Sequence, residues 1–152
     1  MDTFALATGD LFSLFGPVDT YLAPYITYVL LGLLVVNMVF RALEYNQHVS
    51  QAEEGAEAIT RNAGRVATNF LLVAGSFYYL TVEPHGGMVF SVLFLGVFIT
   101  DLFEFESRKV EARRGIPIER PKGAIAASVL SLLYISYQTL FFVIAPVWNS
   151  IV

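Results

Sequence analysis

Four long apolar segments constrain the fold of this chain more than any other feature of its sequence. They cover residues 25–43, 66–82, 87–105 and 124–146. A hydrocarbon core about 30 Å thick is crossed by about 20 helical residues, so each segment can span it, the second with help from the turn before it. Transmembrane β-strands alternate apolar and polar residues, and these segments do not. The sequence therefore predicts an all-α integral membrane protein with four transmembrane helices.

The composition supports this class and excludes two others. Hydrophobic residues make up 56% of the chain and charged residues 14%, whereas a soluble domain is about 45–50% apolar and about 25% charged. The net charge of −4 argues against a nucleic-acid-binding protein, which needs a basic surface. The use of Arg over Lys, seven to two, beside this acidic balance fits a halophilic source. We expect residues 1–152 to form one membrane domain in contact with the lipid bilayer.

The basic residues predict the orientation of the spans. Cytoplasmic connections of membrane proteins are enriched in Lys and Arg. All nine basic residues lie within or beside two connections, residues 44–65 and 106–123. Both connections are therefore predicted to be cytoplasmic, with both termini outside the cell membrane (N-out/C-out).

An N-terminal interfacial helix is predicted over residues 1–16. Its apolar side chains recur at spacings of three and four, which is typical of a helix that lies on a membrane surface. These side chains belong to Phe4, Ala7, Leu11 and Leu14. Gly16 and Pro17 are expected to end this helix.

The second span is predicted to begin as a helix in the cytoplasm. Ser50 and Glu53 have the spacing of a capping box, in which each side chain satisfies a free backbone amide. Apolar residues follow with helical period. Helix two is therefore expected to start near residue 51 and to run to residue 82.

The third span is predicted to extend into the cytoplasm as far as Arg114. Gly115 directly after it is a typical helix stop signal. On this extension Glu104 and Arg108 stand four residues apart in the order that an exposed helix favours. We therefore interpret this pair as part of a solvated helix surface.

Five polar residues are predicted to meet near the cytoplasmic ends of the first three spans: Asn37, Arg41, Arg65, Asn69 and Asp101. Because neighbouring spans are antiparallel, Asn37 and Asn69 come to a similar depth and can pair. Asp101 enters at about the same level, where it can meet Arg41 or Arg65. An ionisable group costs at least about 2.5 kcal/mol at the bilayer centre and therefore needs a partner. Two interpretations follow. The residues line an inner-leaflet polar cavity that gates ions or binds a lipid head group, or they fix helix register through an ion pair and an amide bond.

The fourth span carries a candidate helix-packing seam of small residues. Gly123, Ala127 and Ser131 repeat every four residues, which permits close approach of another helix. Ser131 also shares a face with Tyr134 and Gln138. Such a face suits a ligand or quinone pocket, and it suits helix–helix hydrogen bonds equally well.

No catalytic residue, metal site or cofactor is predicted. The chain has no cysteine, and no phosphate-loop, HExxH or GxSxG motif is found. His48 and His85 are expected on opposite sides of the membrane, so they cannot ligate one haem or metal. Glu44 and His48 have a spacing that metals can use, but two ligands alone are weak evidence.

Two functions therefore remain open. The first is a non-enzymatic accessory, scaffold or assembly subunit, which would bind partner subunits or copies of itself. The second is an oligomeric channel or transporter, whose site would contain Asn37, Arg41, Asn69 and Asp101. A third class, a membrane-embedded enzyme, would need a catalytic arrangement, and we find no motif for one in the sequence.

Overall fold

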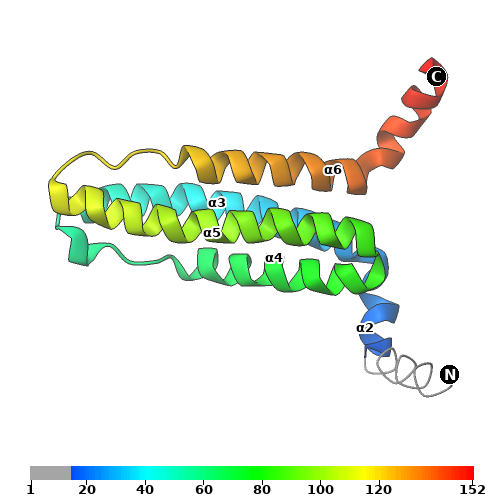
Figure 1. Ribbon diagram of the computed structural model, residues 1–152, viewed down its shortest axis with the longest axis horizontal. Coiled ribbons are helices and arrows are strands. Elements are labelled where there is room, and N and C mark those ends of the chain that lie inside the picture. The colour runs from blue at the N-terminus through cyan, green and yellow to red at the C-terminus, as the bar shows by residue number, and fades with distance from the viewer. Residues whose placement is uncertain (1–14) are drawn as a thin grey trace.

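The structure, a computed structural model, describes residues 15–152, and this part of the chain is all-helical without β-strands (Figure 1). The predicted all-α class is thereby confirmed. The elements are α2 (Gly16–Tyr21), η1 (Ala23–Tyr25), α3 (Ile26–Ala52), η2 (Ala56–Ala58), α4 (Ala63–Val82), α5 (Pro84–Arg114) and α6 (Lys122–Ile151).

The four long helices form an antiparallel bundle. Helix α3 packs against α4 and α6, and α5 packs against the same two helices from the other side. The connections α3–α4 and α5–α6 lie at one end of the bundle, and the tight α4–α5 turn lies at the other end (Figure 1). Close to its C-terminal end α6 bends away from its neighbours (Figure 1), since Pro146 inside the helix removes a backbone hydrogen bond and clashes with the preceding turn.

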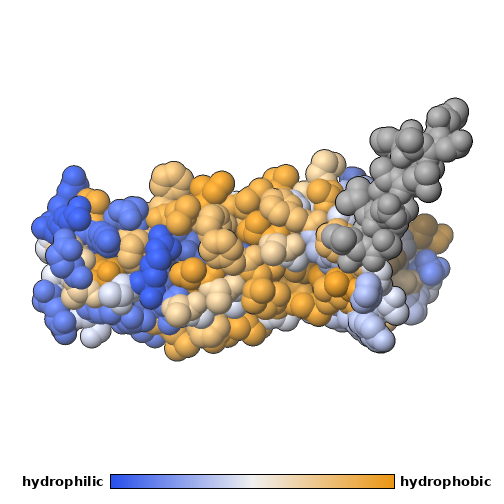
Figure 2. All heavy atoms as spheres, turned by 90° about the horizontal axis from the view of Figure 1, so that it is seen from below, coloured by the Kyte–Doolittle hydropathy of each residue, from blue (hydrophilic) through white to orange (hydrophobic). Residues whose placement is uncertain are grey.

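Three helices are long and apolar enough to cross a membrane: α3 together with η1, α5 and α6. Hydrophobic side chains cover the middle of the bundle, and hydrophilic ones gather at the end that carries the α3–α4 and α5–α6 connections (Figure 2). Helix α4 is 20 residues long and is not among the three, because its buried face includes Arg65, Thr68 and Asn69. The coarser prediction, an all-helical chain with membrane-spanning helices, therefore agrees with the structure.

The predicted start of helix two is wrong. Ser50 lies inside α3, which continues to Ala52, so no capping box forms there. The chain turns at Gly55, whose φ of 114° favours glycine, and α4 begins only at Ala63. Its N-cap is Asn62, whose side chain accepts a hydrogen bond of 3.1 Å from the backbone amide of Arg65.

The predicted end of helix three is confirmed. Helix α5 runs to Arg114 and is followed by Gly115 in the left-handed conformation, with φ 66°. The amide of Ile116 donates to the carbonyl of Glu111 at 3.1 Å. This is the pattern of a helix that is closed by a C-terminal glycine.

The predicted interfacial helix falls almost wholly outside the described residues, since Phe4, Ala7, Leu11 and Leu14 precede residue 15. The prediction that Gly16 and Pro17 end this helix depends on the same residues; in the described part of the chain these two residues begin α2. Proline fits this position because the first turn of a helix does not use its missing N–H group. The Tyr78 hydroxyl donates to Asp19 at 2.7 Å and so joins α2 to α4.

An apolar core fills the half of the bundle next to the α4–α5 turn. Its fully buried members come from all four long helices: Ile26, Leu30, Leu34, Leu72, Tyr79, Phe90, Phe94 and Ile135. Two glycines bring the helices close together. A Cβ atom added at Gly75 would lie 2.6 Å from Leu30 Cδ2, and one added at Gly87 would meet the backbone of Leu80. The other half of the bundle has a core of a different kind.

Candidate functional site

Charged side chains form the core of the half of the bundle nearest the α3–α4 and α5–α6 connections. We call these seven residues the buried charge cluster: Arg41, Glu44, His48, Arg65, Asp101, Glu104 and Arg108. None is more than 8% exposed. Its three arginines and three carboxylates balance in number, as buried charges require if each is to find a partner.

Helical spacing places six of these side chains on the inner faces of α3 and α5, and the seventh, Arg65, comes from α4. On α3 the positions are 41, 44 and 48, and on α5 they are 101, 104 and 108. Steps of three and four residues keep side chains on one face of a helix. The same faces carry the apolar core in the other half of the bundle. The same inner face of each helix is thus apolar in one half of the bundle and charged in the other.

Asp101 accepts hydrogen bonds from two groups of α4 and faces one group of the preceding connection. Arg65 approaches its Oδ1 with Nε and Nη2, both at 2.6 Å. Asn69 donates to Oδ2 at 2.8 Å, and Arg61 Nη1 lies 3.4 Å from the same oxygen. The sequence expectation that Asp101 meets Arg41 or Arg65 is thus resolved in favour of Arg65.

Asn37 and Asn69 form the amide pair that the sequence predicts. The Nδ2 group of Asn37 donates to Asn69 Oδ1 and to Thr68 Oγ1, both at 2.8 Å. Since Asn69 also binds Asp101, it connects α3, α4 and α5 at one level. Four of the five sequence-predicted polar residues are therefore joined in one network.

Arg41, the fifth of these residues, points toward α6. Its Nη1 donates to the carbonyl of Ala124 at 2.8 Å and to the hydroxyl of Ser128. Its Nε lies 3.9 Å from a carboxylate oxygen of Glu104. Arg41 is thus the cluster residue that ties the fourth helix to the others.

His48 fastens the α3–α4 connection to the cluster. Its Nε2 lies 2.8 Å from the carbonyl oxygen of Thr60, so this nitrogen must carry the proton. Its Nδ1 lies 2.9 Å from Arg108 Nη1 and accepts from it. Glu44 accepts from the amide of Asn62 at 3.0 Å. The imidazole is therefore the neutral Nε2–H tautomer, with both ring nitrogens hydrogen-bonded.

Four cluster members were not recognised as site residues from the sequence: Glu44, His48, Glu104 and Arg108. The interpretation of Glu104 and Arg108 as a solvated pair is wrong, because Arg108 is 1% exposed and Glu104 8%. They form an ion pair, but inside the bundle. Their positions at three and seven residues after Asp101 were the signal that they share its inward face.

Of the residues in the helix-packing seam predicted on α6, one is buried inside the bundle and another is exposed at its surface. Ser131 is fully buried and donates to the carbonyl of Ala127 at 2.8 Å. Gly123 is exposed, and no atom of a neighbouring helix lies within 4 Å of a Cβ placed there. Close helix approach occurs instead at Gly75. Gln138 donates to the Tyr134 hydroxyl at 3.2 Å, within the same helix.

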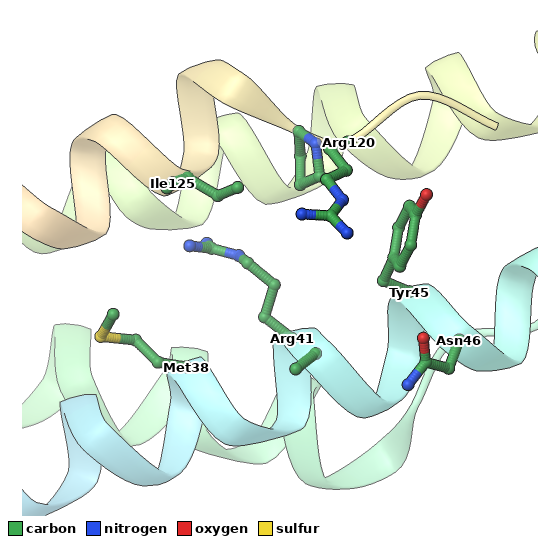
Figure 3. Close-up of a pocket in the computed structure, with 8 residues that line it drawn as sticks. Met38, Arg41, Tyr45, Asn46, Arg120 and Ile125 are labelled. Carbon is green, nitrogen blue, oxygen red and sulfur yellow. The ribbon is translucent and has the colours of Figure 1, made fainter.

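Three cavities border the cluster at the surface of the bundle. The first, of about 350 Å³, lies between α3 and α6 next to Arg41 (Figure 3). The second, of about 290 Å³, lies between α5 and α6. The third, of about 170 Å³, lies between α4 and α5 and reaches Asp101 and Asn69. Within residues 15–152 no group of three or more side chains could hold a metal ion.

Comparison with protein-family profiles gives a match. The profile of a protein family described as a domain of unknown function, DUF7313, matches residues 10–152. No match was found among curated proteins or among solved structures. Because the matched region includes the whole bundle and the buried charge cluster, the chain belongs to the DUF7313 family.

Proposed function

We propose that this chain is a non-enzymatic accessory, scaffold or assembly subunit of a complex in the cell membrane. It works by holding a fixed helical surface for partner subunits or for copies of itself. It uses no catalytic residue, metal or cofactor. In this proposal the bundle is surrounded by the lipid bilayer, and its protein partners contact it within the membrane.

In this proposal all four long helices cross the membrane, and both termini lie outside. Two observations support the arrangement. Helix α4 has 20 residues, which at 1.5 Å per residue is about the 30 Å of a hydrocarbon core. The connections that hold the basic residues lie together at the hydrophilic end of the bundle (Figure 2), as positive-inside orientation requires.

The observation that carries the proposed function is the pairing of carboxylates with arginines inside the buried charge cluster. Asp101 and Glu104 face arginines directly, and Glu44 lies 3.6 Å from Arg65. Charges that satisfy one another inside a bundle fix the register and orientation of its helices. Such a bundle suits a scaffold, whose role depends on a constant shape.

Helix α6 offers the surface for a partner. It is the least buried of the three apolar helices, with 22% of its apolar window buried inside the bundle. Around Pro146 the large side chains of α6 are exposed; Val143, Ile144, Val147 and Trp148 are examples. In this proposal a transmembrane helix of a partner subunit packs along this segment.

Purification in mild detergent after expression at native level tests this function. We expect a partner in stoichiometric amount. Phe142→Ala on α6 should reduce its recovery, and Phe103→Ala on α5 should not, although these phenylalanines are similarly exposed, at 61% and 72%. Recovery of the wild-type chain only as a lone monomer would overturn the proposal.

An oligomeric channel or transporter is the second candidate, and one observation favours it. The cavity between α4 and α5 is lined by the buried Asp101 and Asn69 and by Arg61, which is more exposed. In this alternative, Asn37 and Arg41 complete the inner-leaflet site. Asp101→Asn should then change ion flux in proteoliposomes; unchanged flux combined with lower thermal stability would favour the scaffold.

A further inference from the structure

The cavity between α3 and α6 has an unusual set of lining residues. Two arginines enter it, Arg41 from α3 and Arg120 from the chain just before α6, and Tyr45 forms a side wall (Figure 3). Met38 and Ile125 line the end that lies farther along the apolar spans. No carboxylate is among the lining residues. The cavity is therefore positive at one end and apolar at the other.

Arg41 has hydrogen-bonding capacity that the bundle does not use. Its side chain is 7% exposed, yet Nη2 and Nε have no hydrogen-bond partner within the described part of the chain. A buried donor without a partner costs about 1–3 kcal/mol, and more when the group is charged. A donor of this kind needs an acceptor, and because Arg41 lines the cavity, a ligand there can supply it.

Arg120 adds a second guanidinium group on the opposite wall. It points toward the centre of the cavity in Figure 3. Among residues 15–152 it takes part in no ion pair, unlike Arg41 and Arg108. The adjacent α6 helix begins at Lys122, and the first turn of a helix carries partial positive charge that favours anions. Two guanidinium groups and the first turn of α6 thus lie around the cavity.

The position of the cavity along the bundle identifies the kind of anion. Arg41 lies at the cytoplasmic end of the first predicted span, and Ile125 lies at the start of the fourth. Along the chain, charged residues lie on one side of these positions, at Glu44 and Lys122, and mainly apolar residues lie on the other side. Ile125 is 41% exposed toward the surroundings of the bundle. An occupant with a phosphate and an acyl chain would match both ends of the cavity.

We propose that this cavity binds the phosphate of an anionic glycerophospholipid from the cytoplasmic leaflet. The phosphate oxygens accept hydrogen bonds from Arg41 and Arg120, since guanidinium groups bind phosphate with two parallel N–H donors. The acyl chain follows Met38 and Ile125 toward the membrane interior. The inference rests on the proposed crossing of the membrane by α3 and α6, and it requires no partner subunit.

Arg120→Gln is the most direct test, because the side chain is exposed and outside the buried charge cluster. Delipidated full-length protein is mixed with phosphatidylglycerol, phosphatidylcholine or inorganic phosphate, and binding is followed by native mass spectrometry and thermal shift. Wild-type protein should bind one phosphatidylglycerol about tenfold more tightly than phosphatidylcholine, and Arg120→Gln should remove this preference. Arg114→Gln, which removes an exposed arginine outside the cavity, should leave it unchanged.

Ile125→Trp separates the cavity from general surface charge. It fills the apolar end without changing any charge, and it should weaken phosphatidylglycerol binding as well. Equal binding of both lipids, or equal behaviour of Arg120→Gln and Arg114→Gln, would overturn the proposal. Binding of inorganic phosphate as tight as that of phosphatidylglycerol would assign the site to a soluble anion and overturn the lipid assignment. Loss of the co-purifying partner in the Phe142→Ala experiment is independent of all these results.

Discussion

Arg65 of α4 and Asp101 of α5 form an ion pair with 2.6 Å between Nη2 and Oδ1, and neither side chain is more than 3% exposed. The pair lies between two helices that are adjacent in the chain and joined by the tight turn at the opposite end. Its burial is possible because Asn69 donates a further hydrogen bond to the carboxylate. Packing of α4 on α5 therefore buries both charges together.

Asp101→Asn should destabilise the bundle strongly. The substitution leaves the Arg65 guanidinium buried without its closest counter-charge, and breaking a buried pair costs about 3–5 kcal/mol. The free energy of unfolding is measured by titration with a denaturing detergent in mixed micelles. Glu106→Gln on the same helix is the control, because Glu106 is exposed and such substitutions stay within about 0.5 kcal/mol.

Removal of both partners should cost less than the two single changes together. Arg65→Met with Asp101→Leu leaves no unpaired charge, and buried ion pairs can be replaced by apolar residues at small cost. The measurement is a double-mutant cycle on the same unfolding free energies, with an expected coupling of about 1–3 kcal/mol. Strict additivity would show that the two groups do not interact in the folded protein.

His48→Phe should loosen the α3–α4 connection. The phenyl ring occupies similar space, but it cannot donate to the Thr60 carbonyl or accept from Arg108, and each lost partner costs about 1–3 kcal/mol. Hydrogen–deuterium exchange of residues 53–62 should become faster, and the free energy of unfolding should fall. His85→Phe, at an exposed position, should change neither quantity; equal effects of both variants would contradict the assigned role.

Gly87→Ala and Gly96→Ala should have different effects on the melting temperature, although both residues lie on α5. The new Cβ at residue 87 would meet the backbone of Leu80, which cannot move without separating α4 from α5. Residue 96 has open space around it, and alanine there raises helix propensity by about 1 kcal/mol. The melting temperature in detergent should therefore fall clearly for Gly87→Ala and stay equal or rise for Gly96→Ala.

Part of the charged core could be predicted from the sequence, because a membrane fixes the distance of each helical residue from the interface. Antiparallel spans bring residues at equal distance from the interface together, and this places Asn37 beside Asn69 and Asp101 beside Arg65. Pairs of residues far apart in the sequence become predictable when the direction of each helix and its position across the membrane are both known. For the parts of the helices outside the bilayer, no such reference exists.

The errors arose where only local rules were available. Spacing of four residues identifies Glu104 and Arg108 as a pair, but it does not say whether another helix covers that face. The capping pattern at Ser50 is sound chemistry for a helix start. However, no stop signal precedes Gly55, so α3 continues past Ser50 and ends at Ala52. Tertiary coverage and chain continuity decide such cases, and a single motif contains neither.

Cysteine labelling tests the proposed topology directly, since the chain has no cysteine of its own. Glu57→Cys and Thr81→Cys introduce single thiols at exposed positions near the two ends of α4. If α4 crosses the membrane with the α3–α4 connection inside, a membrane-impermeant maleimide labels Thr81→Cys in intact cells and Glu57→Cys only after permeabilisation. Labelling of both positions from outside would mean that α4 does not cross, and the reverse pattern would invert the orientation. Ser150→Cys near the end of α6 provides the independent control, because N-out/C-out orientation requires it to react like Thr81→Cys.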